Sequence, residues 1–224
     1  MRPDFQLLIK PVSADCNQSC VYCFYRRVGD LYARTPEHRM SAETLDGLVR
    51  RFLELRLPAS VFCWQGGEPT LAGLEFYRRA VVLMQTHGRG GQSVTNALQT
   101  NGLLIDADWC RFLAQYRFLV GLSLDGPEDL HDFYRGRGSH AAALRSAALM
   151  SEHGVEFNIL AVVNDRTARE ARRIYTDFRE RGMLYLQFIP CVESGPDGAP
   201  MPFSVTPEAY GDFLCELFDL WYPD

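Results

Sequence analysis

Three cysteines stand within eight positions near the start of the sequence, at Cys16, Cys20 and Cys23, in a C-x3-C-x2-C arrangement. The chain has 7 cysteines in 224 residues, so an average eight-residue window holds roughly a quarter of one. Iron–sulfur clusters are usually held by four thiolates, and a loop this short can turn three sulfurs toward one small cluster. Three thiolates leave one iron able to bind a small molecule, because an open coordination position distinguishes a reactive metal site from a structural one. The spacing therefore predicts a [4Fe-4S] cluster that takes part in a reaction.

Three other interpretations of these cysteines fit the sequence less well. A disulfide framework needs an even number of cysteines and an oxidising compartment. A zinc finger needs a fourth ligand nearby, but the next Cys or His is His38, and no second C-x2-C pair exists. Three unreactive thiols are the remaining alternative. The five histidines of the chain form no pair with metal-ligand spacing.

Polar and glycine-rich residues follow several apolar runs farther along the chain. Gly66 and Gly67 permit the backbone to approach a ligand closely, and their carbonyls could accept hydrogen bonds from an ammonium group. Taken alone, two glycines after a strand indicate only a turn. Ser123 and Asp125 could equally be ligand-binding groups or the polar end of a strand. A lone arginine such as Arg135 is usually a solvated surface residue.

The elements that must position these residues alternate between strands and helices. Apolar runs predict six strands, at Phe5–Val12, Ser60–Gln65, Val94–Gln99, Phe118–Leu124, Phe157–Val163 and Tyr185–Pro190. Helices are predicted after the N-cap residue Ser41 and at Leu74–Thr86, Asp106–Gln115, Ala141–His153, Thr167–Arg181 and Thr206–Tyr222. Loops are predicted at Gly29–Arg39 and Glu193–Ser204. Such alternation predicts an α/β fold with a parallel sheet and right-handed crossovers, with the polar motifs gathered at the carboxyl ends of the strands.

Composition limits the class of protein. A length of 224 residues with 47% hydrophobic content suits one domain with a sizeable core. The formal net charge of -5 gives no sign of a nucleic-acid partner. The sequence contains no run of about 18 apolar residues, so we expect no membrane span. No apolar run of suitable length follows Met1, so we expect no secretory signal. Free cysteines and an oxygen-sensitive cluster both favour a reducing cytoplasm.

The other cysteines look structural. Cys63 lies in a predicted strand, and Cys110 and Cys215 lie in predicted helices, where a buried cysteine behaves as a small hydrophobic residue. Cys191 differs because it follows the sixth predicted strand and so lies near the edge where the polar motifs gather.

The cysteine loop, with Tyr22 directly before Cys23, resembles the signature of radical S-adenosylmethionine (SAM) enzymes. The resemblance implies a partial (β/α)6 TIM-like barrel, an open sheet covering about three quarters of a circle. It also implies that SAM chelates the open iron through its amino and carboxylate groups. Reduction of the cluster would then cleave SAM to a 5′-deoxyadenosyl radical, which abstracts a hydrogen atom from a C–H bond.

The same resemblance assigns five SAM-binding residues. It implies that Tyr22 lies beside the cluster and leans on SAM, and that Gly67 contacts the SAM amino group. Ser123 would bind the ribose or carboxylate of SAM, and Arg135 would pair with its carboxylate. Val192 would offer a backbone or apolar contact to the adenine, although plain packing is the alternative for this residue.

A closer resemblance runs through nearly the whole chain. The segments that carry it are Leu8–Pro11, Cys23–Tyr25, Trp64–Phe76, Leu98–Gly102, Phe118–Pro127, Val155–Leu160 and Leu217–Trp221. They are similar to anaerobic sulfatase-maturating enzymes. This similarity implies oxidation of a cysteine or serine of a sulfatase polypeptide to Cα-formylglycine. It also implies an electron donor of the flavodoxin or ferredoxin type.

One departure from that family concerns the carboxyl-terminal side. The family continues into a SPASM domain that holds further cysteines for auxiliary clusters and an aspartate that accepts the substrate's proton. This sequence stops at Asp224, so we expect residues 1–224 to form the radical SAM core domain without that region. The catalytic proton acceptor therefore stays unassigned. The sequence is then either a fragment or a naturally short homologue that binds and cleaves SAM without completing maturation. Two further alternatives are a radical SAM enzyme that modifies a different peptide and a non-catalytic paralogue that binds SAM and the cluster.

Overall fold

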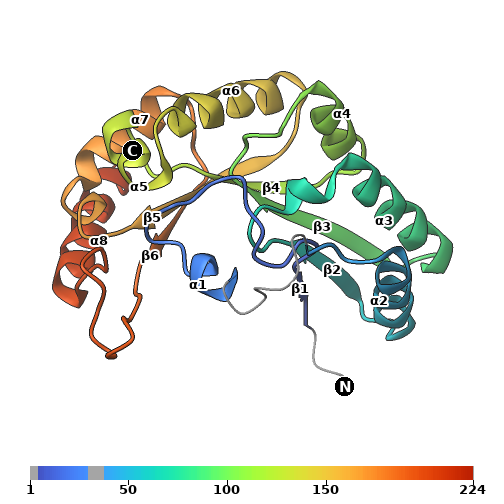
Figure 1. Ribbon diagram of the computed structural model, residues 1–224. Coiled ribbons are helices and arrows are strands. Elements are labelled where there is room, and N and C mark those ends of the chain that lie inside the picture. Colours follow the sequence, from blue (N-terminus) through green and yellow to red (C-terminus); the bar gives the residue numbers. More distant parts are fainter. Residues whose placement is uncertain (1–4, 30–37, 224) are drawn as a thin grey trace.

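Six parallel strands form one curved sheet in the computed structural model, which describes residues 5–29 and 38–223. The strands pair in chain order and are β1 (Leu7–Ile9), β2 (Ala59–Trp64), β3 (Ser93–Thr100), β4 (Leu119–Ser123), β5 (Phe157–Val163) and β6 (Leu186–Pro190). Figure 1 shows the sheet as an open arc, with most helices along its convex side and the cysteine loop on its concave side. The predicted α/β fold with an open, partial barrel is confirmed.

Most of the described helices cover the convex side of the sheet, and the short helix α1 lies on its concave side (Figure 1). The helices are α1 (Tyr25–Gly29), α2 (Ala42–Glu54), α3 (Leu74–His87), α4 (Ala107–Gln115), α5 (Glu128–Arg135), α6 (Ser139–Glu152), α7 (Ala171–Glu180) and α8 (Pro207–Trp221), with 3-10 turns η2 (Pro69–Ala72) and η3 (Thr167–Arg169). Ser41, Asp106 and Thr206 cap the amino ends of α2, α4 and α8 through their side-chain oxygens. In the ranges that the structure describes, none of the helices is long and apolar enough to cross a bilayer.

The structure differs from the sequence prediction at several places. The first strand, predicted at Phe5–Val12, covers only Leu7–Ile9. The short helices α1 and α5 were not predicted, although Pro127 followed by Glu128 and Asp129 is a recognisable helix start. The predicted helix at Thr167–Arg181 is divided into η3 and α7 at Glu170, whose backbone is not helical (φ -127°, ψ 25°). The Asn164 side chain accepts the backbone N–H groups of Arg166 and Thr167 at the start of η3. Most of the loop predicted at Gly29–Arg39 lies outside the described residues.

The core fills the space between the sheet and the helices that cover it. Phe62 and Trp64 of β2 are fully buried, and Trp64 packs edge-on against Tyr77 of α3. The indole N–H of Trp64 donates to Asn96 Oδ1 at 2.9 Å, which satisfies the polar atom of this buried ring. Each large buried side chain stabilises the fold by about 1.5–3 kcal/mol. The core therefore secures the outer side of the sheet and leaves the concave side available for a site.

The loop after β2 is packed directly against the cysteine loop. Gly67 N donates to Ser13 O at 2.9 Å, and Glu68 N donates to Asp15 O at 2.7 Å. A Cβ atom at Gly67 would lie only 2.1 Å from Asp15 O and 2.5 Å from Ala14 O. Glycine is required here because two backbones approach each other too closely for a side chain.

Replacing Gly67 with Ala should therefore displace the cysteine loop. We expect Gly67→Ala to lower the free energy of unfolding by about 2 kcal/mol or more, because backbone on both sides must move. The matched control is Gly47→Ala within α2, where a new Cβ meets nothing within 4 Å. That control should stabilise the protein by up to about 1 kcal/mol. Denaturant unfolding measures both, and equal stabilities for the two variants would contradict the packing argument.

Candidate functional site

A cavity of about 300 Å³ opens at the carboxyl ends of the strands, where the loops from the whole sheet meet. The cysteine loop follows β1, the glycine loop follows β2, and the ends of β3 to β6 complete the wall. The lining includes every residue that the sequence analysis assigned to the cluster or to SAM: Cys16, Cys20, Tyr22, Cys23, Gly67, Ser123, Arg135 and Val192. Folding thus brings these eight residues together, from positions spread over most of the chain.

The three cysteines present their sulfurs to this cavity from a loop without regular secondary structure. Cys20 is buried, Cys23 is half-buried, and Cys16 is the most exposed of the three. Gln18 N lies 3.4 Å from Cys16 Sγ, and Asn101 Nδ2 lies 3.9 Å from it, so both can donate to this sulfur. Burial of the sulfur raises the pKa of Cys16 to about 11, and the Glu68 carboxylate adds to the shift. A metal that binds here must therefore displace a proton from the thiol.

The arrangement fits a cluster better than a single ion. Across the described residues, no three His, Cys, Asp or Glu side chains are placed to chelate one metal ion. In an iron–sulfur cube each thiolate binds a different iron, so its ligands surround a volume rather than converge on a point. Three thiols on one cavity wall, with N–H donors directed at Cys16, match that requirement. The residues present therefore fit an iron–sulfur cluster.

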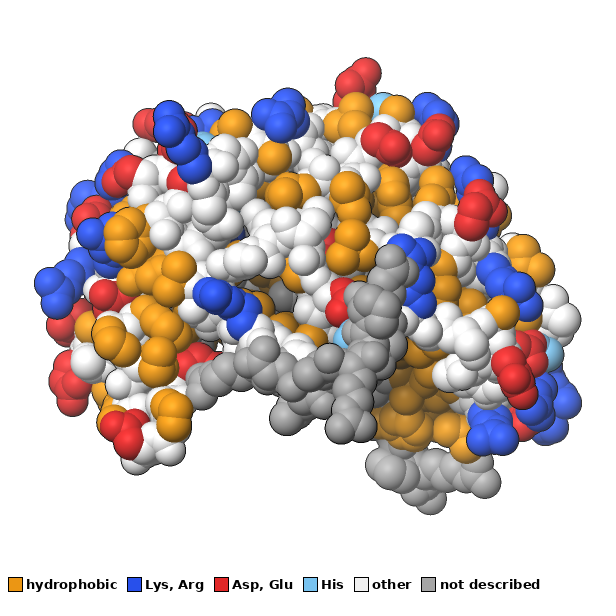
Figure 2. All heavy atoms as spheres, in the orientation of Figure 1, with side chains coloured by type: hydrophobic (Ala, Val, Ile, Leu, Met, Phe, Trp, Pro, Cys, Tyr) orange, Lys and Arg blue, Asp and Glu red, His pale blue; other side chains and the backbone are white. Residues whose placement is uncertain are grey.

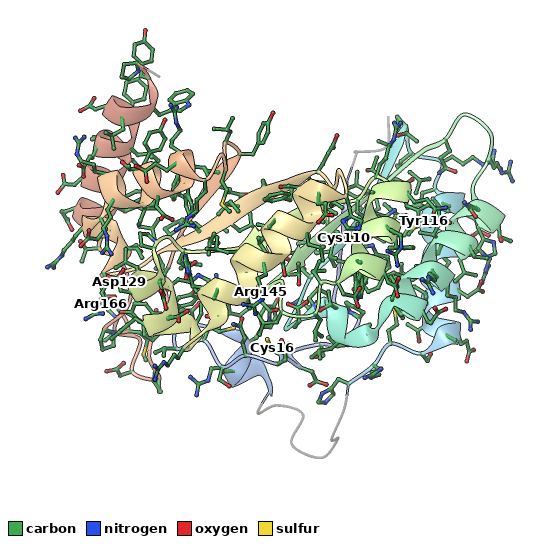
Figure 3. All side chains as sticks on the ribbon, turned by 90° about the horizontal axis from the view of Figure 1, so that it is seen from above. Cys16, Cys110, Tyr116, Asp129, Arg145 and Arg166 are labelled. Carbon is green, nitrogen blue, oxygen red and sulfur yellow. The ribbon has the colours of Figure 1, made fainter. Side chains whose placement is uncertain are left out.

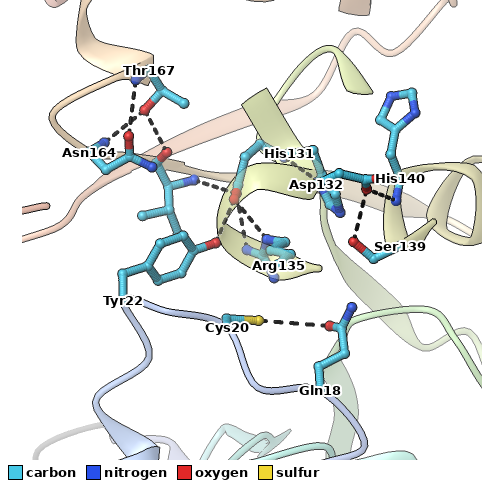
Figure 4. A network of polar contacts seen from close by, with 12 residues as sticks. Gln18, Cys20, Tyr22, His131, Asp132, Arg135, Ser139, His140, Asn164 and Thr167 are labelled. Atoms are coloured by element: carbon cyan, nitrogen blue, oxygen red, sulfur yellow. Dashed lines mark hydrogen bonds and ion pairs between the residues drawn. The ribbon is translucent and has the colours of Figure 1, made fainter. Parts of the chain in front are cut away.

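Asp125, just after β4, is the centre of a buried polar network beside the cavity. Its partners Tyr22 and Arg135 are labelled in Figure 4. Its carboxylate accepts from Arg135 Nε at 2.8 Å and from Arg135 Nη2 at 3.0 Å. It also accepts from the Tyr22 hydroxyl at 2.5 Å and from Val162 N at 3.0 Å. Burial alone would raise the pKa of Asp125, but the charge and hydrogen bonds of Arg135 hold it below its usual value. The ionised carboxylate therefore joins the cysteine loop, α5 and β5.

This network supplies Arg135 with a carboxylate partner inside the fold, which the sequence analysis did not foresee. Arg135 is only 9% exposed, yet it still lines the cavity. Its guanidinium also lies over the Tyr22 ring, 5.5 Å from the ring centre. Burial raises the pKa of Tyr22 well above its usual value, so the hydroxyl keeps its proton and donates to Asp125. Arg135 is thus held in place before any ligand enters.

Glu68 is a second buried carboxylate whose role the sequence did not indicate. It accepts from Thr70 N and Thr70 Oγ1 at 3.0 and 2.6 Å, from Thr100 Oγ1 at 2.8 Å, and from Asn101 N at 2.8 Å. Burial raises the pKa of Glu68, although these hydrogen bonds oppose the shift. The carboxylate connects the loops after β2 and β3, so two walls of the cavity are fixed to each other.

The remaining cysteines differ in position, and each of the seven is a free thiol. Cys191 is buried, lines the cavity and packs in a small apolar cluster with Cys20 and Tyr22. Burial raises the pKa of Cys191 to about 12. Cys110 is buried on α4, well apart from Cys16 in Figure 3, as expected of a core residue. Cys215 is exposed on α8, so the expectation of a buried structural role was wrong for this residue.

Comparisons with known proteins agree with this picture. A sequence model of the family described as Radical SAM superfamily matches residues 11–178. The cysteine-type anaerobic sulfatase-maturating enzyme of Clostridium perfringens (strain 13 / Type A) is 42% identical over 227 residues, covering 99% of this chain and 61% of that protein. The serine-type anaerobic sulfatase-maturating enzyme of Bacteroides thetaiotaomicron is 38% identical over 235 residues, covering 96% of this chain and 56% of that protein.

Solved structures extend the similarity to three dimensions. The structure described as native anSMEcpe with bound AdoMet and Cp18Cys peptide matches with a TM-score of 0.90 and 41% identity. The match covers 99% of this chain and 61% of that one. The chain therefore spans about three fifths of the length of the relatives that it resembles.

The buried Asp125–Arg135 pair should be essential to stability. Asp125→Asn keeps the shape of the side chain but leaves a buried guanidinium without a counter-charge, at a cost of about 3–5 kcal/mol. Asp129→Asn is the matched control, because Asp129 also accepts two hydrogen bonds from one guanidinium, from Nη1 and Nη2 of Arg173, but on the surface. Loss of the exposed Asp129–Arg173 ion pair should change the free energy of unfolding by about 1 kcal/mol or less. Similar effects of the two substitutions in denaturant unfolding would contradict this assignment.

His131 should make stability depend on pH. It is buried, its Nδ1 accepts from Asp125 N at 3.1 Å, and burial lowers its pKa from 6.5 to about 4. The unfolded chain therefore binds a proton before the folded one does, and the free energy of unfolding falls as pH drops from 6.5 toward 4. The loss should be on the order of 3 kcal/mol.

The control is His131→Asn, whose side-chain oxygen can still accept from Asp125 N but does not titrate. The pH dependence of this variant should be flatter than that of the wild type over the same interval. Urea unfolding at several pH values measures the difference. Parallel pH profiles would show that His131 does not carry the dependence.

Proposed function

Because this chain belongs to the radical SAM superfamily, we propose that residues 1–224 form a radical SAM core that binds a [4Fe-4S] cluster and SAM in the described cavity. The observation that carries the proposal is the meeting of three cysteines, a glycine loop and Arg135 around one cavity. The cavity lies at the carboxyl ends of parallel strands, where barrels of this kind carry their chemistry.

Eight residues of this chain would bind the iron–sulfur cluster and SAM. Cys16, Cys20 and Cys23 would bind the cluster, and Tyr22, Gly67, Ser123, Arg135 and Val192 would bind SAM. The bound pair supplies a one-electron reductive cleavage of SAM to a 5′-deoxyadenosyl radical, which can take a hydrogen atom from an unreactive C–H bond.

The chain's own contribution is orientation and exclusion of water. The carboxylate of Asp125 holds the Tyr22 hydroxyl and the Arg135 guanidinium, so neither side chain must be ordered when a ligand binds. Gly67 keeps the glycine loop close to the cysteine loop, which sets the width of the cavity. Tyr22 and Cys20 are each only 8% exposed, so water has little access to the inner wall. A reactive radical is protected from side reactions in such a site.

The substrate is a sulfatase polypeptide, of which a cysteine or serine is oxidised to Cα-formylglycine. The names of the two relatives and the peptide in the solved relative support this choice. A flavodoxin or ferredoxin would supply the electron, and the reducing cytoplasm would preserve both the cluster and the seven free thiols. A different peptide substrate and a non-catalytic paralogue are the alternatives that experiment must separate.

The cluster assignment is tested by anaerobic reconstitution with iron and sulfide. We expect about four irons per chain, and 5′-deoxyadenosine after reduction in the presence of SAM. The combined variant Cys16→Ala, Cys20→Ala, Cys23→Ala should lose both, because no thiolate remains to hold the cluster. Cys215→Ala, at an exposed position on α8, should keep both. Circular dichroism verifies that each variant is folded, and SAM cleavage by the triple variant would refute the proposal.

The substrate is tested by mass spectrometry. The reconstituted chain is incubated with SAM, reductant and a synthetic peptide that carries a Cys-x-Pro-x-Arg sulfatase motif. A mass change from cysteine to formylglycine supports sulfatase maturation. SAM cleavage without that change favours another peptide, and SAM binding without cleavage favours a non-catalytic paralogue.

A further inference from the structure

The loop after β3 places a side-chain amide beside the first of the three cysteines. Asn101 directly follows β3, is 7% exposed and lines the same cavity as Cys16. Its Nδ2 lies 3.9 Å from Cys16 Sγ and 2.8 Å from Asn17 Oδ1. An amide nitrogen carries two N–H groups, so it can donate to both partners at once. The amide therefore connects the loop after β3 to the cysteine loop.

The orientation of this amide is fixed by the chain. Leu103 N donates to Asn101 Oδ1 at 3.0 Å. An N–H group needs an acceptor, and the nitrogen of a side-chain amide cannot serve as one. Exchanging the two amide atoms would place two donors against each other. The nitrogen is therefore the atom turned toward Cys16.

The backbone that carries Asn101 is anchored from two sides. Asn101 N donates to Glu68 Oε2 at 2.8 Å, which ties it to the loop after β2. Gly102 N donates to Thr100 Oγ1 at 3.1 Å, and Ser146 Oγ of α6 donates to Gly102 O at 2.6 Å. The amide is thus held near the sulfur before any metal or ligand enters the cavity.

Metal binding changes what Cys16 requires from its neighbours. As a thiol, its sulfur can donate to Asn17 Oδ1, 4.0 Å away. A metal-bound thiolate has lost that proton and can only accept. Gln18 N at 3.4 Å and Asn101 Nδ2 are donors already in place for it. Gln18 belongs to the cysteine loop itself, whereas Asn101 reaches the sulfur from a different part of the fold.

A donor at Cys16 bears on the reduction of the cluster proposed for this cavity. Hydrogen bonds to the sulfurs help to set the reduction potential of an iron–sulfur cluster. Reduction adds one negative charge, so an N–H group directed at a ligand sulfur stabilises the reduced form more than the oxidised form.

We infer that Asn101 is a positioning residue that donates to the Cys16 thiolate and makes the cluster easier to reduce. Its side chain then tunes the one-electron step that precedes SAM cleavage. This inference rests on the proposed function, because it requires the cluster in the cavity.

The reduction potential tests this role. The wild type and the variants are reconstituted anaerobically with iron and sulfide, and the cluster is titrated by EPR without SAM. Asn101→Ala removes the donor, and Asn101→Asp keeps an acceptor for Leu103 N but replaces Nδ2 with an oxygen. Each should disfavour reduction by about tenfold, which lowers the potential of a one-electron couple by about 59 mV.

The matched control is Asn158→Ala, which removes the same amide near the amino end of β5, away from the cavity. It should change the reduction equilibrium by about twofold or less. A lower potential in Asn101→Asp alone would reflect its added charge and would overturn the inference.

Pulsed EPR detects the donor without a substitution. When 15N is confined to asparagine side-chain amides, the reduced wild-type cluster should show a 15N hyperfine coupling, because Asn101 Nδ2 lies beside Cys16 Sγ. Asn101→Asp should lose this coupling, and Asn158→Ala should keep it. If the Asn101 variants fail to take up iron, the wild-type coupling alone decides, and its absence overturns the inference.

The results separate this inference from the proposed function. If the wild type holds the cluster and cleaves SAM, but the variants keep its potential or its 15N coupling is missing, the Asn101 inference fails and the proposed function stands. If the wild type takes up no cluster, both fail.

Discussion

One buried carboxylate holds the inner wall of the site together. Asp125 is 1% exposed and accepts four hydrogen bonds, from Arg135, Tyr22 and Val162. A carboxylate can remain ionised at this depth only when a counter-charge and several donors replace water. Arg135 provides the counter-charge, and the partners come from the cysteine loop, α5 and β5. The position of the cysteine loop therefore depends on the charge of a residue at the end of β4.

Glu68, after β2, is also a buried carboxylate held by hydrogen bonds, but its pKa shifts in the opposite direction. Glu68 accepts from four neutral donors, and among the described residues no ion pair to its carboxylate is found. Burial raises the pKa of Glu68, whereas Arg135 holds the pKa of Asp125 below its usual value. The two acids together join loops that follow β1, β2, β3 and β4. The cysteine loop has no regular secondary structure to hold it. It is held by the Asp125 carboxylate through the Tyr22 hydroxyl, and by the backbone N–H groups of Gly67 and Glu68, which donate to Ser13 O and Asp15 O.

The ends of the sheet contrast with this closed network. A parallel sheet that does not complete a circle leaves two edges, and strand edges are surfaces on which proteins either block pairing or use it. At β6 the edge is accompanied by the apolar side of α8 and continues into the cavity wall.

The sequence by itself determined the cysteine spacing, the six strands, the capped helices and the family resemblance, because each depends on residues close together in the chain. Only the tertiary structure decided that Arg135 pairs with Asp125, that Tyr22 reaches an acid 103 positions away, and that Gly67 is needed for packing. These features depend on contacts between distant segments, and a local pattern of residue types carries no information about which distant side chain will satisfy a buried charge.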